Sequence, residues 1–96
     1  MVNKDDVIKA LKQVVDPEIR LDIWTLGLVY NIDINNEEVK ILMTLTSPMC
    51  PYGPMLVDDV KYKTKDIAKA KDVNVELTFN PPWKPSDDVK MMLGIQ

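Results

Sequence analysis

Regular spacing of apolar side chains at the start of the chain predicts an amphipathic helix over residues 3–15. Asn3 can act as its N-cap by accepting a hydrogen bond from the first turn. Pro17 disfavours helical backbone at Asp16, so we expect the helix to end there. The apolar stripe consists of Val7, Ile8, Leu11, Val14 and Val15.

Alternating apolar and polar residues predict three strands, over residues 28–34, 39–46 and 73–79. Asn35 and Asn36 separate the first two strands and tolerate positive φ, which is typical of a tight turn. These two strands are therefore expected to form a hairpin. The expected inward positions are Leu28, Tyr30, Ile32 and Ile34, then Val39, Ile41, Met43 and Leu45, then Val73, Val75, Leu77 and Phe79.

Two more helices complete the pattern. Proline is accepted in a first helical turn, so Pro51 or Pro54 is expected to begin the second helix. Ser86 can cap a short C-terminal helix that ends at Gly94. The order α-β-β-α-β-α predicts an α/β (α+β) fold, a two-layer sandwich in which helices pack on one face of a small mixed three-stranded sheet. A helical crossover between the second and third strands can place them parallel.

Composition narrows the class of protein. The 96 residues are enough for one domain, residues 1–96, and 46% hydrophobic with 28% charged residues is ordinary for a soluble globular protein. No segment has the apolar length of a signal peptide or a membrane span, and one cysteine cannot form an internal disulfide, so a cytoplasmic protein is expected. A net charge of −3 argues against nucleic-acid binding. The absence of histidine excludes Cys–His and Ser–His catalytic pairs and histidine-ligated metal sites.

Cys50, the only cysteine, stands between two prolines where a strand pattern gives way to a helical pattern. An isolated cysteine is often a small buried hydrophobe. Connections, however, usually run over the surface, and the start of a helix stabilises a thiolate. A reactive, partly exposed thiol is the better interpretation.

Other polar residues admit two interpretations each. Asp16 and Glu18 flank Pro17, and spacing alone favours a turn in which Asp16 accepts a nearby N–H, over a ligand or orienting partner for Cys50. Three hydroxyl residues precede Cys50 and suit a strand, but they could also hydrogen-bond its sulfur or a bound cluster; they are Thr44, Thr46 and Ser47. Gly27 suggests a bulge or a close backbone approach. Trp83 could be an exposed anchor for a partner or a lid on the core.

Several blocks of the sequence, taken together, resemble one family: the iron–sulfur cluster assembly family that includes bacterial SufT and PaaD and the eukaryotic MIP-eighteen-like domain. The blocks are Asp16-Pro-Glu-Ile19, Leu26-Gly-Leu-Val-Tyr30, Met43-Thr-Leu-Thr-Ser-Pro-Met-Cys-Pro51, Asn80-Pro-Pro-Trp-Lys-Pro85 and Leu93-Gly94. The resemblance implies a small α/β domain that matures or delivers iron–sulfur clusters. Its partners would be iron–sulfur carrier or assembly proteins and client apoproteins.

The resemblance also assigns residues. The reactive cysteine of the family corresponds to Cys50, the acidic motif to Asp16 and Glu18, and the hydroxyl positions to Thr44, Thr46 and Ser47. Two positions depart from the family pattern. Met49 stands where relatives often have glycine, and the segment Ser86-Asp-Asp-Val-Lys90 lacks the Met-Ser and Arg common there.

Three functions are compatible with these residues. The first is a non-enzymatic assembly or transfer factor. Because clusters are usually held by four thiolates, Cys50 would supply only one metal ligand to an iron–sulfur cluster or to iron. The cluster or iron would be shared transiently with a partner, or with a second copy in a homodimer. The second is a thiol enzyme or redox protein with Cys50 as nucleophile, but it lacks a histidine base and a resolving cysteine. The third is an interaction module whose cysteine is incidental. The first is preferred.

Overall fold

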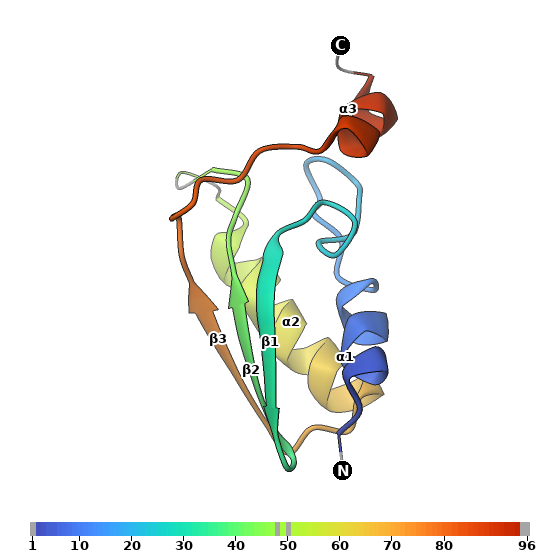
Figure 1. The fold of residues 1–96 in the computed structure, drawn as a ribbon, viewed down its shortest axis with the longest axis vertical. Helices are drawn as coiled ribbons and strands as arrows, with labels where there is room; N and C mark the ends of the chain where they lie inside the picture. Colours follow the sequence, from blue (N-terminus) through green and yellow to red (C-terminus); the bar gives the residue numbers. More distant parts are fainter. Residues whose placement is uncertain (1, 48, 50, 95–96) are drawn as a thin grey trace.

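The computed structural model describes residues 2–47, 49 and 51–94. Its elements follow the expected order α-β-β-α-β-α (Figure 1). They are α1 (Lys4–Leu11), β1 (Val29–Asn35), β2 (Glu38–Met43), α2 (Gly53–Ile67), β3 (Asp72–Leu77) and α3 (Asp87–Leu93). Among the described residues, no helix has both the length and the apolar character that crossing a membrane requires.

The three strands form one mixed sheet in the order β1-β2-β3. β1 pairs antiparallel with β2, with Ile32 opposite Ile41, and β2 pairs parallel with β3, with Ile41 opposite Val75. The predicted hairpin is confirmed, with Asn36 in the turn at φ 57°. The predicted crossover geometry is also confirmed, because α2 carries the chain from β2 to a parallel β3. The parallel pair brings the carboxyl ends of β2 and β3 to the same edge of the sheet.

α1 and α2 cover one face of the sheet and leave the other face open (Figure 1). The predicted inward positions of β2 are all buried, and they meet buried side chains of both helices. The core contributed by these elements includes Val7 and Leu11 from α1, Val39, Ile41 and Met43 from β2, and Leu56 and Val60 from α2. The predicted small mixed sheet with helical cover is therefore confirmed.

α3 is the exception to helical packing on that face. It lies beyond the end of the sheet, because the proline-rich segment 78–85 leads the chain away across the ends of β2 and β1 (Figure 1). Both predicted caps of α3 are confirmed: the Ser86 hydroxyl accepts a hydrogen bond from the Val89 N–H at 3.2 Å, and Gly94 ends the helix at φ 73°. Asn3 caps α1 in the same manner, through the N–H of Asp5.

Three predicted boundaries were wrong. α1 ends at Leu11 instead of residue 15, because the chain turns at once and Val15 forms an isolated antiparallel bridge with Asp22. β2 ends at Met43 instead of residue 46. Leu77 and Phe79 were expected inside, but they are 41% and 40% exposed, because β3 ends at Leu77 and both side chains line a hollow beside α2.

Candidate functional site

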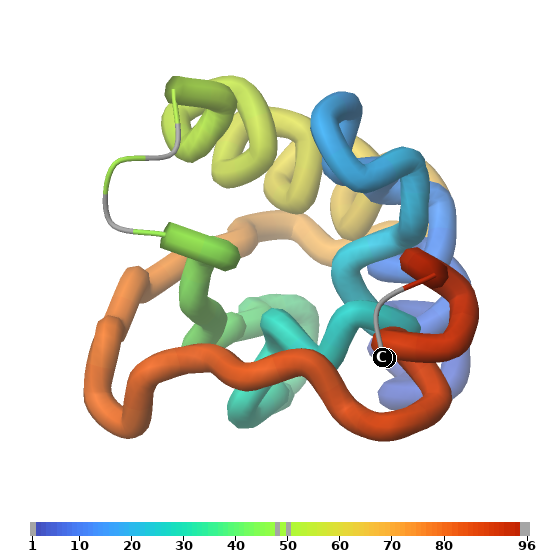
Figure 2. Tube along the Cα trace, turned by 90° about the horizontal axis from the view of Figure 1, so that it is seen from above, coloured from blue at the N-terminus to red at the C-terminus, as the bar shows by residue number. Residues whose placement is uncertain are grey.

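Three segments meet at the end of the domain where β2 and β3 terminate (Figure 2). They are the described residues of the segment after β2, namely 44–47, 49, 51 and 52, together with residues 78–85 after β3 and residues 12–28 between α1 and β1. Figure 2 looks down on this end, which we call the site end. Cys50 belongs to the first segment but lies outside the described residues. Its covalent neighbours Met49 and Pro51 are both exposed, Met49 by 86%.

Asp16 is completely buried in the segment 12–28. Its Oδ1 accepts hydrogen bonds from the N–H groups of Glu18 at 2.8 Å and Ile19 at 3.2 Å. Its backbone carbonyl accepts from the Arg20 N–H at 2.7 Å. The predicted turn at Asp16 is therefore confirmed: one carboxylate oxygen holds the backbone after Pro17 in place.

The other oxygen of Asp16 has no such role. Oδ2 is buried and has no hydrogen-bond partner within the described part of the chain. Leaving a charged acceptor in this condition is unfavourable, since a buried unsatisfied polar group typically costs about 1–3 kcal/mol and a charged one more. Turn formation therefore explains the position of Oδ1 but not that of Oδ2. Glu18, by contrast, is exposed, so the two acidic residues of the motif occupy different environments.

The hydroxyl residues before Cys50 also divide into two groups. Thr44 is fully buried, and its Oγ1 makes only a long contact of 3.4 Å to the Leu45 carbonyl. Thr46 and Ser47 are partly exposed, and the Ser47 Oγ accepts a hydrogen bond from the Met49 N–H at 3.1 Å. Only Thr46 and Ser47 therefore reach the surface beside the loop.

Trp83 closes the site end from the proline-rich segment. Its side chain is partly buried against the core, and its indole N–H donates a 2.6 Å hydrogen bond to the Leu26 carbonyl. Of the two interpretations, the structure favours the lid. The neighbouring Gly27 adopts φ 77°, a left-handed conformation that favours glycine, and a bulge follows between Val29 and Asn31.

Two apolar hollows flank the first turns of α2, and sequence reasoning missed both. One has a volume of about 440 Å³ and lies between α2 and the end of β3; its apolar lining is Leu45, Pro54, Val57, Leu77 and Phe79. The other, of about 410 Å³, lies between α2 and the segment after α1; it is lined by Val15, Met55, Leu56, Asp58, Asp59 and Tyr62. The helical spacing of Met55 and Tyr62 was a signal for the second hollow. Its other wall, Val15, is remote in sequence.

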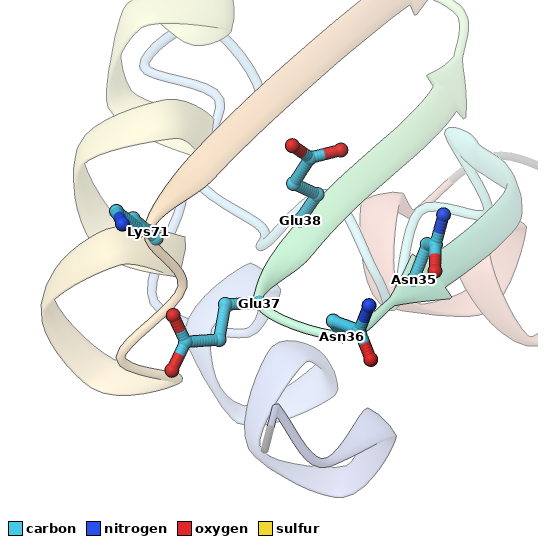
Figure 3. Close-up of a pocket in the computed structure, with 5 residues that line it drawn as sticks. All are labelled: Asn35, Asn36, Glu37, Glu38 and Lys71. Atoms are coloured by element: carbon cyan, nitrogen blue, oxygen red, sulfur yellow. The ribbon is translucent and has the colours of Figure 1, made fainter.

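A larger hollow of about 540 Å³ lies at the opposite end of the domain, at the hairpin turn. Figure 3 shows that its polar side chains point in different directions and do not converge on one point. They are Asn35, Asn36, Glu37, Glu38 and Lys71, all exposed. This arrangement offers no organised ligand-binding group.

The described residues also contain no group of three or more histidine, cysteine, aspartate or glutamate side chains placed to hold a metal ion. Because an iron–sulfur cluster usually takes four thiolate ligands, a chain with one cysteine supplies at most a quarter of such a set.

Comparison with known proteins agrees with the resemblance seen in the sequence. The Fe-S protein maturation auxiliary factor YitW of Bacillus subtilis is 46% identical to this chain, over 97% of this chain and 95% of its own length. The Fe-S protein maturation auxiliary factor SufT of Staphylococcus aureus is 41% identical over 85% of this chain and 98% of its own length. An iron-sulfur cluster carrier protein of Synechocystis is 28% identical over 98% of this chain, which matches only 27% of that longer protein.

The fold has a solved counterpart. The crystal structure of a domain of unknown function (DUF59) from Bacillus anthracis superimposes with a TM-score of 0.86 at 35% identity, covering 96% of this chain and 92% of that one. The family described as iron-sulfur cluster assembly protein matches residues 4–77, which include Asp16, Thr44 and Cys50. The chain belongs to the iron–sulfur cluster assembly protein family, and its role lies in cluster assembly or transfer.

Proposed function

We propose that this chain handles an iron–sulfur cluster as transient cargo, with Cys50 supplying one sulfur ligand and a partner supplying the others. The observation that carries the proposal is that this member of the family has a single cysteine, Cys50, whose described neighbours Met49 and Pro51 are both exposed. A lone thiolate binds a cluster too incompletely to keep it, which suits delivery better than storage.

The other site residues then have supporting roles. Asp16 fixes its own turn through Oδ1, and we assign to its buried, unpartnered Oδ2 the role of orienting a group of the Cys50 loop. Thr46 and Ser47 offer hydroxyls at the surface, while Glu18 offers an exposed charge. Thr44 is the member of the motif that supports the fold from inside. None of these roles involves chemical turnover of a substrate, so we propose a factor and not an enzyme.

Partners follow from the missing ligands. A cluster carrier or assembly protein would bring the cluster, and a client apoprotein would accept it; a second copy of this chain could contribute one further thiolate. The iron-sulfur cluster carrier protein of Synechocystis contains a region similar to this chain within a longer protein. This supports a direct interaction between such a domain and a carrier. We place this exchange in the cytoplasm, where an unpaired thiol stays reduced.

Anaerobic reconstitution tests the proposal. The wild-type chain, Cys50→Ser and Met49→Ala would each receive iron, sulfide and glutathione, and then apo-ferredoxin as acceptor. We expect cluster-bound iron, acid-labile sulfide and transfer to fall to the level of a protein-free control in Cys50→Ser alone, because serine removes the thiolate. Met49→Ala changes the adjacent side chain but keeps the sulfur, so it should resemble wild type. Equal cluster content and equal transfer in wild type and a folded Cys50→Ser would refute Cys50 as a ligand.

A further inference from the structure

The hollow between α2 and the segment after α1, which we call the Met55 groove, combines apolar walls with negative charge. Its exposed apolar side chains come from two segments: Met55 and Tyr62 are 50% and 64% exposed on α2, and Val15 is 47% exposed on the facing segment. Asp58 and Asp59 follow Met55 by three and four residues and precede Tyr62 by four and three, so all four lie on the same side of the helix. Among the described residues that line the groove, none is basic.

The stability of α2 does not account for these two carboxylates. Asp58 and Asp59 stand beyond the first turn, where the helix dipole favours anions little, and aspartate is a poor residue for a helix interior. Lys61 and Lys63 follow at helical spacing, yet the ion pair present among the described residues joins Lys40 and Glu76 instead. Within the described part of the chain, these two acidic groups in the wall of an apolar groove thus have no ionic partner.

We infer that the Met55 groove binds a basic amphipathic helix of the partner protein. Met55 and Tyr62 are seven residues apart, about 10 Å along α2, which matches apolar anchors at positions i, i+3 or i+4, and i+7 of a docked helix. Lysine or arginine beside those anchors would meet Asp58 and Asp59. A second copy docking symmetrically through the same groove is disfavoured, because it would oppose these carboxylates to their own equivalents.

The position of the groove connects it to the proposed function, on which the identity of the partner as an iron–sulfur protein rests. Met55 follows Gly53, the first residue of α2, by only two residues, about 3 Å along the axis. The loop that contains Cys50 leads directly into Gly53. A helix held in the groove would therefore bring the partner's own ligands to the neighbourhood of that loop.

A designed peptide tests the groove without knowledge of the natural partner. The probe is an acetylated Leu/Lys/Ala helix of about 14 residues, roughly four turns, with leucines on one face. Two controls accompany it: a peptide of the same composition with the leucines dispersed, and a version with glutamate for lysine. We expect binding of the probe alone, with amide shift changes in NMR spectra confined to residues around Val15, Met55 and Tyr62. Binding should weaken as salt rises, because the charge attraction is screened.

Variants of the chain distinguish charge-dependent binding in the groove from nonspecific apolar binding. Asp58→Asn with Asp59→Asn should weaken binding about tenfold, equivalent to about 1.4 kcal/mol. Asp66→Asn, an exposed aspartate of α2 outside the groove lining, should leave the affinity unchanged. Met55→Ser should also weaken binding, whereas Met91→Ser on α3 should not, although Met91 is more exposed.

The outcomes also separate this inference from the cluster proposal. Cys50→Ser should bind the probe as wild type does, so a failure of the cysteine experiment would leave peptide binding intact. Equal binding of the dispersed or glutamate peptide, or shift changes centred elsewhere, would overturn the groove assignment. So would concentration-dependent dimerisation of the free chain that Met55→Ser abolishes, since the occupant would then be a second copy.

Discussion

Asp16→Ala is expected to lower the free energy of unfolding by about 2–4 kcal/mol, because it leaves two backbone N–H groups in a partly buried turn without their acceptor. Those groups belong to Glu18 and Ile19, and both now donate to Oδ1. Urea denaturation followed by circular dichroism measures the change. Glu18→Ala is the matched control: its side chain is exposed, so the effect should stay within about 0.5 kcal/mol.

Asp16→Asn distinguishes the two oxygens of the same carboxylate. Asparagine keeps one oxygen for the two N–H groups but replaces the buried, unpartnered Oδ2 by an uncharged amide. We expect its stability to remain within about 1 kcal/mol of wild type while cluster transfer declines. Unchanged transfer in this folded variant would assign Asp16 to the turn alone.

Trp83→Ala should produce the second large effect, a loss of about 2–3 kcal/mol. The change removes a partly buried aromatic surface from the core and the indole donor of the Leu26 carbonyl. Trp83→Phe keeps most of the surface and should lose about 1 kcal/mol, the worth of one hydrogen bond. The midpoint of urea unfolding reports both values.

A local readout accompanies the global one. Because Trp83 fastens the proline-rich segment that leads to α3, hydrogen exchange should accelerate in α3 before it does in β2. Lys84→Ala, at an exposed neighbouring position, should change neither measurement. If Trp83→Ala matched wild type in both, Trp83 would not act as a lid.

The hairpin and the central strand were predictable because their signals are local. Asn36 favours the turn by its own backbone preference, although the turn consists of Asn36 and Glu37, one position later than the expected Asn35 and Asn36. The alternation in β2 coincides with complete burial at Ile41 and Met43. The end of α1 was not predictable, since Val15 continues the helical apolar spacing but pairs with Asp22 instead. That pairing depends on how residues 12–28 fold back, which no local pattern records.

The residues of the site could be predicted from the sequence motif, but which of them are exposed could not. Spacing cannot tell that Asp16 and Thr44 are buried while Glu18 and Ser47 face outwards, because burial is decided by segments that arrive from elsewhere in the chain. The same reason hides the Met55 groove, whose walls stand about 40 positions apart between Val15 and Met55.

The arrangement of α1 has a practical consequence for anyone who tethers this domain. α1 begins beside the hairpin turn, whereas α3 lies at the site end of a body whose long axis measures 42 Å (Figure 1). A fluorophore or a sensor-chip linker attached ahead of Lys4 would lie at the opposite end of the domain from the segment that follows β2, while one attached behind α3 would start at the same end as that segment. Measurements of binding kinetics should therefore immobilise the domain through the residues that precede α1.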